Sequence, residues 1–149
     1  MKTISDLDAK RRKYAQEYYA DRVTPDMIDS LLSNQVFVFG SNVSGMHGGG
    51  AAATAVRLFG AQMGKGEGLQ GQSYAIPTME RLENTGAAVH RFCQFAKEHP
   101  EKQFLVTKIG CGIAGYDVKE IAPFFEEAID VQNVSLPRQF WEVLGIRMF

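Results

Sequence analysis

Two glycine-rich segments contain the residues of this chain best suited to chemistry. Residues 40–50, the first glycine loop, end in three consecutive glycines, and residues 110–115, the second glycine loop, read Gly-Cys-Gly-Ile-Ala-Gly. Consecutive glycines let backbone N–H groups converge on a ligand, and the amino end of a following helix favours an anion. Neither loop contains Lys or Arg. The pair therefore predicts a diphosphate site built from backbone amides.

Two side chains of the first loop are candidates for acting on such a ligand. His47 is a candidate general base, because imidazole commonly serves in this role at neutral pH. The alternative is a loop histidine that makes one hydrogen bond. Asn42 would orient a water molecule or hold a ribose, or else would cap its own loop backbone. Asn42 and His47 are therefore the catalytic candidates.

The second loop adds a thiol, and an aromatic ring follows it. Cys111 precedes an expected helix, where a thiolate is stabilised, but a nucleophile would need a base and only His47 is available. We therefore expect Cys111 to line the site. Tyr116 would stack on a ribose or a base, or else would pack beneath the loop.

Both loops connect an expected strand to an expected helix. The apolar patterns predict strands at 36–39, 73–78, 103–109 and 133–136, helices at 5–20, 25–33, 51–59, 84–98, 117–130 and 137–143, and a loop at 60–71. This order predicts a three-layer α/β fold in which helices flank a mostly parallel central sheet. Since ligands bind at the carboxyl edge of such sheets, we expect the two glycine loops to lie side by side there.

Local signals define the expected helix starts. Thr24, which precedes a proline, is a start signal for the helix at 25–33, and Asp117 with Glu120 forms a capping box. Asn84 or Thr85 would cap the helix that ends before residue 100.

Composition excludes several classes of protein. The 149 residues are 45% hydrophobic with a net charge of −1, so without a basic excess we expect no nucleic-acid partner. Residues 1–20 do not resemble a signal peptide, no apolar run is long enough to span a membrane, and two cysteines are too few for a disulfide framework. We expect one cytoplasmic domain with no membrane partner, with residues 1–34 as a helical extension and 35–149 as the α/β core.

The second loop also matches the G-x-G-x-x-G pattern of dinucleotide-binding proteins. Too few residues follow Gly115 for the remaining half of that fold, and Asp130, at the expected offset, falls at a helix end. A dinucleotide-dependent oxidoreductase is therefore the weaker hypothesis.

Three stretches taken together resemble a known family. They read Phe-Gly-Ser-Asn-Val-Ser-Gly-Met-His-Gly-Gly-Gly-Ala-Ala at 39–52, Tyr-Ala-Ile-Pro-Thr at 74–78 and Phe-Leu-Val-Thr-Lys-Ile-Gly-Cys-Gly-Ile-Ala-Gly-Tyr at 104–116. In this order they resemble the macro domains, which bind and sometimes hydrolyse ADP-ribose derivatives. The stretch Gly-Glu-Gly-Leu-Gln-Gly-Gln, at 66–72, is similar to a short phage- and bacteria-associated branch. The resemblance implies a macro-domain-like fold with an ADP-ribose site.

Several family positions hold other residues here. Hydrolytic macro domains have an acid where this chain has Ala52, and usually an aromatic residue where it has Ala114. The acid that contacts adenine has no clear counterpart, with Asp26 and Asp29 as candidates. The resemblance therefore implies a module that binds or sequesters ADP-ribose. The alternative is a hydrolase that removes ADP-ribose from a protein, nucleic acid or small molecule.

The expected ligand is a small-molecule nucleotide, and neither a metal nor a cofactor is expected. The predicted ligand-binding residues come from both loops and their flanks: Gly40, Ser41, Asn42, Gly48, Gly49, Gly50, Ala51, Gly110, Cys111, Gly112, Ile113, Ala114, Gly115 and Tyr116.

Overall fold

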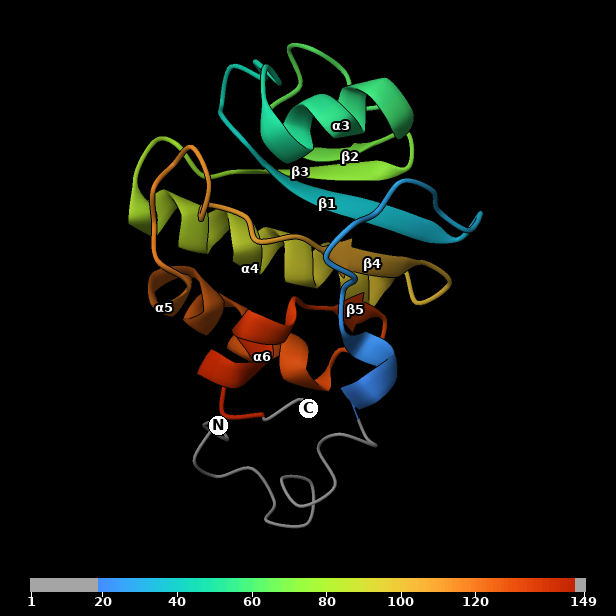
Figure 1. The fold of residues 1–149 in the computed structure, drawn as a ribbon, viewed down its shortest axis with the longest axis vertical. Helices are drawn as coiled ribbons and strands as arrows, with labels where there is room; N and C mark the ends of the chain where they lie inside the picture. Colours follow the sequence, from blue (N-terminus) through green and yellow to red (C-terminus); the bar gives the residue numbers. More distant parts are fainter. Residues whose placement is uncertain (1–18, 147–149) are drawn as a thin grey trace.

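The computed structural model describes residues 19–146, which form an α/β fold around one five-stranded sheet (Figure 1). In chain order the elements are η2 (Ala20–Arg22), β1 (Gln35–Ser41), α3 (Gly50–Leu58), β2 (Gly68–Gln70), β3 (Ser73–Pro77), α4 (Leu82–Glu98), β4 (Gln103–Val106), α5 (Val118–Ile121), η3 (Ala122–Asp130), β5 (Val134–Ser135) and α6 (Arg138–Val143). The strand order is β2-β3-β1-β4-β5, with only β2 antiparallel to its neighbour. The predicted α/β class with a mostly parallel sheet is confirmed.

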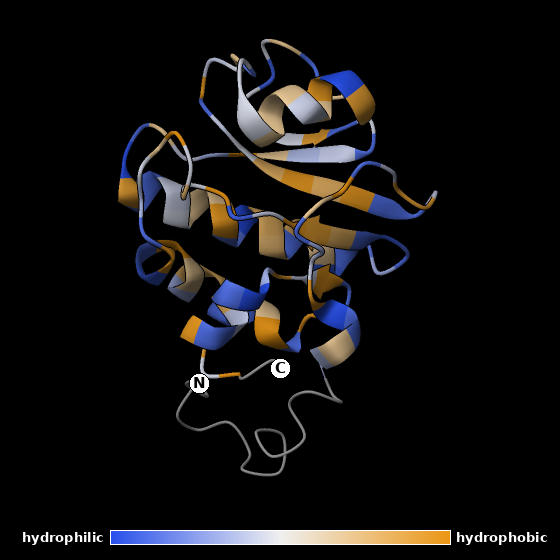
Figure 2. Cartoon of the chain, viewed as in Figure 1, coloured by the Kyte–Doolittle hydropathy of each residue, from blue (hydrophilic) through white to orange (hydrophobic). Residues whose placement is uncertain are grey.

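The central strand β1 is buried on both of its faces. Val36 and Val38 point into the larger core cluster, while Phe37 and Phe39 belong to a smaller cluster on the opposite face. Successive residues of a strand face opposite sides of the sheet, so an unbroken apolar run suits a strand covered on both sides. Figure 2 shows β1 and β4 largely in the hydrophobic colours.

Helices cover both faces of the sheet. α3 packs on the side of Phe37, and α4, η3 and α6 pack on the other side (Figure 1). Aromatic rings fill that second layer, where Phe92 meets Tyr74, Phe104 and Phe125 at centroid distances of 5.1, 5.5 and 6.3 Å. This packing holds the sheet in place. The loops that follow β1, β3 and β4 leave the sheet at one edge, because these strands are parallel.

The expected helix at 25–33 is wrong. After η2 the chain runs without a helix as far as β1. The N–H of Thr24 donates to the carbonyl of Leu136 (2.9 Å), and the N–H of Leu136 donates to the carbonyl of Arg22 (3.1 Å). These tertiary hydrogen bonds override the local start signal.

Two other element boundaries differ from expectation in the first half of the chain. The expected loop at 60–71 contains the short strand β2. α4 begins at Leu82 with Arg81 as its cap, so neither Asn84 nor Thr85 caps it. Thr85 is instead buried in the first turn, where its hydroxyl donates to the carbonyl of Arg81 (3.2 Å).

The second half of the chain follows the expectation more closely. β4 ends at Val106, earlier than expected, and the capping box of Asp117 and Glu120 is confirmed. The helix that it opens becomes a 3-10 helix after α5, where Pro123 removes a backbone donor. The expected helix at 5–20 lies almost entirely outside the described residues.

Candidate functional site

The loops that follow β1, β3 and β4 surround a cavity of about 420 Å³. β1 pairs in parallel with both β3 and β4, so the three loops leave the sheet at the same edge. The two glycine loops approach closely: a Cβ on Gly40 would lie 3.4 Å from the backbone nitrogen of Gly110. A Cβ on Gly49 would lie 3.3 Å from Cδ1 of Ile113. The expected juxtaposition of the two loops is confirmed.

Most of the predicted binding residues line this cavity. Those that do are Gly40, Ser41, Asn42, Gly48, Gly49, Gly50, Ala51, Gly110, Gly112, Ile113 and Ala114, whereas Cys111, Gly115 and Tyr116 do not. The structure adds Met46, Ala52, Thr78, Met79, Thr107, Lys108 and Ile109, which sequence reasoning missed. Thr78 and Met79 follow a strand parallel to β1, and that pairing was the signal that would have placed them at this edge.

The amino end of α3 forms one wall of the cavity. Gly49 occupies the cap position, and no side chain caps the helix. The first N–H groups of a helix lack intrahelical acceptors, and its dipole leaves partial positive charge there. A Cβ on Gly48 or Gly50 would meet only open space. Bare backbone therefore faces the cavity, as the glycine pattern predicts.

Lys108 brings a cation to this backbone site. It is the one ionisable side chain among the described residues that line the cavity. The neighbouring Thr107 is tied to the sheet, because its hydroxyl donates to the carbonyl of Val38 (2.7 Å). Sequence reasoning searched for a cation inside the loops and missed Lys108, which lies just before the second one.

A second cavity of about 300 Å³ adjoins the first and shares three lining residues with it, among them Lys108. Its far wall is the non-helical segment that follows η2, and Asp26 lines it. Thr24 lines it as well, is only 5% exposed, and has no hydrogen-bond partner for its hydroxyl. Buried polar groups normally have a partner, so this hydroxyl suits a polar ligand group. Asp29 lines a third cavity, which shares Pro25, Met27 and Ile28 with the second.

Asn42 lies at the first cavity, but its side chain is engaged within its own loop. Its Oδ1 accepts from the N–H of Met46 (2.8 Å) and from the hydroxyl of Ser44 (2.9 Å). Its Nδ2 donates to the carbonyl of Met46 (3.1 Å). The side chain therefore shapes the loop, in line with the alternative considered above, and holds the backbone of Met46 in place.

His47 is buried and does not line the cavity. Its Nε2 lies 3.0 Å from the carbonyl oxygen of Lys65, and its ring packs edge-on against Phe39 at a centroid distance of 5.1 Å. Since a carbonyl oxygen can only accept, Nε2 carries the proton. His47 therefore anchors the first glycine loop. Its side chain is not brought to the cavity that Asn42 lines.

Cys111 and Tyr116 pack against the large core cluster instead of lining the cavity. The thiol of Cys111 lies 3.5 Å from the carbonyl of Ile109. Burial raises the pKa of this thiol, and the carboxylate of Asp117 adds to the shift. Because a raised pKa keeps a thiol protonated at neutral pH, Cys111 is unsuited to act as a nucleophile.

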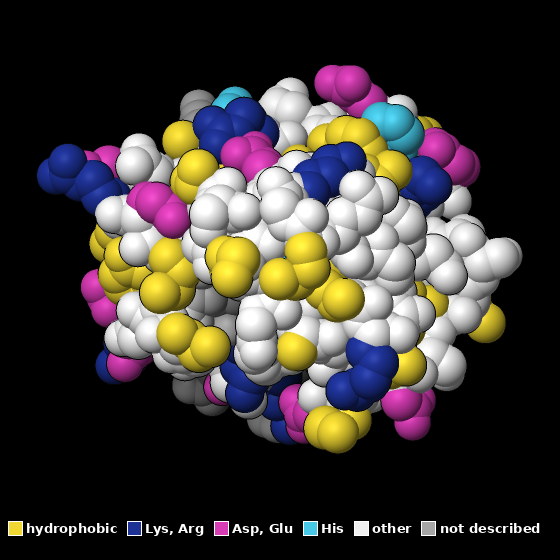
Figure 3. Space-filling model, turned by 90° about the horizontal axis from the view of Figure 1, so that it is seen from above, with side chains coloured by type: hydrophobic (Ala, Val, Ile, Leu, Met, Phe, Trp, Pro, Cys, Tyr) yellow, Lys and Arg dark blue, Asp and Glu magenta, His cyan; other side chains and the backbone are white. Residues whose placement is uncertain are grey.

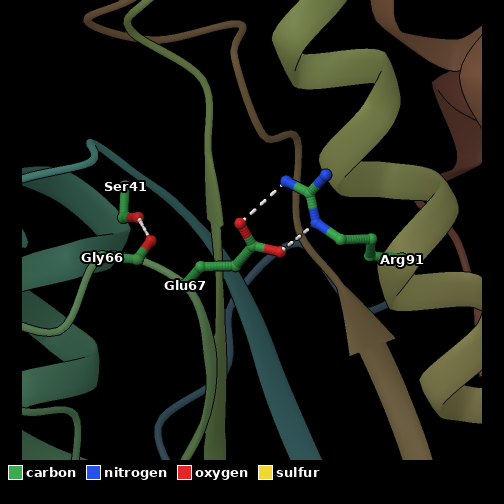
Figure 4. Close-up of polar contacts among 4 residues, drawn as sticks. All are labelled: Ser41, Gly66, Glu67 and Arg91. Atoms are coloured by element: carbon green, nitrogen blue, oxygen red, sulfur yellow. Dashed lines mark hydrogen bonds and ion pairs between the residues drawn. The ribbon is translucent and has the colours of Figure 1, made fainter.

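The segment 64–67 holds the first glycine loop in position (Figure 4). The buried hydroxyl of Ser41 donates to the carbonyl of Gly66, and a Cβ on Gly66 would overlap the backbone of Asn42. The next residue, Glu67, accepts two hydrogen bonds from Arg91 of α4, at 2.6 and 2.8 Å. This contact connects the first loop to α4.

Within residues 19–146, no group of three or more His, Cys, Asp or Glu side chains is placed to hold a metal ion. No helix in that part of the chain is long and apolar enough to cross a membrane. No family model, curated protein or solved structure matches the chain. Function is therefore inferred from the two adjoining cavities.

Proposed function

We propose that this protein binds ADP-ribose or a closely related nucleotide diphosphate, as a binding or sequestering module with a macro-domain-like fold. The observation that carries the proposal is the pair of adjoining cavities, one between two glycine loops and one beside the segment that follows η2. Their volumes of about 420 and 300 Å³ lie in the usual range for small-molecule sites.

The diphosphate would lie in the first cavity. Backbone N–H groups at the amino end of α3 and in the second loop would donate to its oxygens, and the ammonium group of Lys108 would balance its charge. Each hydrogen bond to a charged group contributes about 1.5–3 kcal/mol. A few such bonds suffice to hold a diphosphate.

The base would lie in the second cavity. The carboxylate of Asp26 would accept from an amino group of the base, and the hydroxyl of Thr24 would gain a partner. Met27 and Ile28 also line this cavity and would contact the face of a ring. Lys108, at the junction, would mark where the diphosphate meets the nucleoside.

The contacts within the first cavity favour binding over hydrolysis. None of the described residues that line it carries a carboxylate, and Ala52 stands where hydrolytic macro domains have an acid. The ring of His47 lies outside the cavity, and the polar atoms of Asn42 are engaged in its loop. A general base is therefore not in place.

Titration calorimetry with ADP-ribose tests the proposal, with Gly112→Val as the diagnostic variant. Gly112 does not have a positive φ, and a Cβ there would meet nothing within 4 Å, so the domain should fold normally. The valine side chain would occupy the space where the diphosphate approaches the backbone. We expect the affinity to fall about a hundredfold or more.

Ala87→Val, at an exposed position of α4 outside the cavities, is the matched control and should bind like the wild type. Unchanged affinity in folded Gly112→Val would show that the loops do not hold the ligand. Release of ADP-ribose from an ADP-ribosylated protein, lost in Asn42→Ala, would establish the hydrolase instead.

A further inference from the structure

Three exposed apolar side chains surround the mouth of the first cavity. Met46, Met79 and Ile113, here called the apolar rim, line the cavity and are 63%, 45% and 78% exposed. They come from three separate loops, which follow β1, β3 and β4. Figure 3, which looks down on the α3 side, shows groups of hydrophobic side chains in the middle of that face and charged groups mostly around its margin.

The backbone beneath the rim is held firmly. Both backbone groups of Met46 are hydrogen-bonded to the side chain of Asn42, at 2.8 and 3.1 Å. Met79 follows Thr78, whose N–H donates to the carbonyl of Ser41 (2.8 Å). Single exposed apolar residues are ordinary, but three that line one cavity offer apolar contacts to a ligand from three sides.

The second cavity and the apolar rim adjoin different parts of the first cavity. Lys108 is shared with the second cavity, where the proposed function places the base, whereas none of the rim residues lines that cavity. A ligand with its base in the second cavity and its diphosphate between the loops would therefore have its distal group at the rim. Methionine side chains adapt to flat rings and contact them favourably.

Resting on the proposed function, we propose that the preferred ligand is a nucleotide diphosphate whose distal ribose carries an uncharged, flat ring. Burial of apolar surface contributes about 25 cal/mol per Å², so removing about 60 Å² from water would raise the affinity about tenfold. ADP-ribose itself, with a free distal ribose, would leave the rim exposed.

Titration calorimetry with ADP-ribose and with NADH tests this inference, because NADH is ADP-ribose with an uncharged ring on its distal ribose. We expect the wild type to bind NADH about tenfold more tightly. In the double variant Met46→Ser, Met79→Ser the ratio of the two dissociation constants should fall to about one. Bound NADH should also show the blue-shifted fluorescence of a ring in an apolar environment.

Met63→Ser is the matched control, since Met63 is 55% exposed and does not line either cavity. It should keep the tenfold ratio. Equal affinities of the wild type for the two nucleotides, or a ratio that persists in the double variant, would overturn the inference while leaving the proposed function intact. Failure of both nucleotides to bind the wild type would overturn the proposed function and this inference together.

Discussion

Individual glycines decide where this molecule has space and where it has none. At Gly48 and Gly112 a Cβ would meet nothing within 4 Å, so the missing side chain leaves room for a ligand. At Gly45 a Cβ would overlap the backbone of Lys65, so the missing side chain lets two loops pack. Substitutions at the first two glycines therefore act on binding, and a substitution at Gly45 acts on folding.

At the same scale, Tyr74 should give the folded state a pH dependence. It is buried in β3, and burial, with the carboxylate of Glu67 adding to it, raises the pKa of its phenol from 10.0 to about 12. The unfolded chain ionises first, so the stabilisation is complete below about pH 10 and is lost as the pH rises through about 12. Over that window the wild type should lose at most about 2–3 kcal/mol more unfolding free energy than Tyr74→Phe.

Urea unfolding of both proteins at several pH values measures this difference. Parallel stability curves for the two would contradict it.

The sequence was informative for residues that act through their backbone and less so for those that act through their side chains. The glycine patterns predicted the parts of the cavity that backbone lines, because glycines have no side chains. They did not reveal that Lys108 lines the cavity while Cys111 packs against the core. Which way a loop side chain turns depends on neighbours that are distant in sequence.

Among the elements, the segment 64–67 determines the position of the first glycine loop. It receives the hydrogen bonds of Ser41 and His47, and its residue Glu67 is fixed by the two hydrogen bonds from Arg91. The first glycine loop, which lines the first cavity, is thus held by a segment that does not itself line it.

Glu67→Gln should therefore weaken ligand binding more than it weakens the fold. The ion pair is partly exposed, so its loss should cost less than about 1 kcal/mol of stability. Without this ion pair the segment 64–67 would be less ordered, and binding would have to restore the order. We therefore expect the affinity for ADP-ribose to fall about three- to tenfold. Calorimetry and thermal unfolding of the same samples separate the two effects.

Lys97→Gln is the control, because Lys97 also leaves α4 toward a carboxylate, that of Glu127, at 4.0 Å. Its affinity should match the wild type. A loss of affinity no larger in Glu67→Gln than in Lys97→Gln would show that the contact between Glu67 and Arg91 does not affect binding.

The elements that sequence reasoning placed correctly have patterns that reflect their own burial. β1 and β3 contain unbroken apolar runs, at 36–39 and 74–77, and the α5 start has both members of its capping box. β2 was missed because so short a stretch, which begins at Gly68 and is followed by Gly71, becomes a strand only through pairing with β3. The helix at 25–33 was wrong for the same kind of reason, since the backbone of its expected cap, Thr24, is hydrogen-bonded to Leu136, more than a hundred residues away.

Over the whole molecule, the start and the end of the described chain are joined around one side chain. Arg22 is buried, and its guanidinium donates to four backbone carbonyls, those of Ala128, Ile129, Val131 and Val134, at 2.7–3.0 Å. The ring centroids of Tyr19 and Trp141 lie 5.4 and 5.0 Å from it. The indole N–H of Trp141 also donates to the carbonyl of Arg22 (2.8 Å).

Arg22→Ala should consequently destabilise the entire domain. Four buried carbonyls would lose a charged donor, and we expect a loss of about 3–5 kcal/mol in urea unfolding. Arg22→Lys should recover only part of it, because one ammonium cannot reach all four acceptors. Arg81→Ala, at a side chain 73% exposed, should change stability by less than about 0.5 kcal/mol. A loss below about 1 kcal/mol in Arg22→Ala would show that the junction is not essential.

The same junction sets an order for assembly during protein synthesis. A chain emerges from the ribosome amino end first. Both glycine loops and the strands β1 to β4, whose loops line the first cavity, precede β5 in the chain. The segment containing Asp26 cannot be fixed until its acceptors at Val134 and Leu136 have emerged. In a nascent chain, the residues that line the first cavity would therefore be available before those that fix the wall of the second.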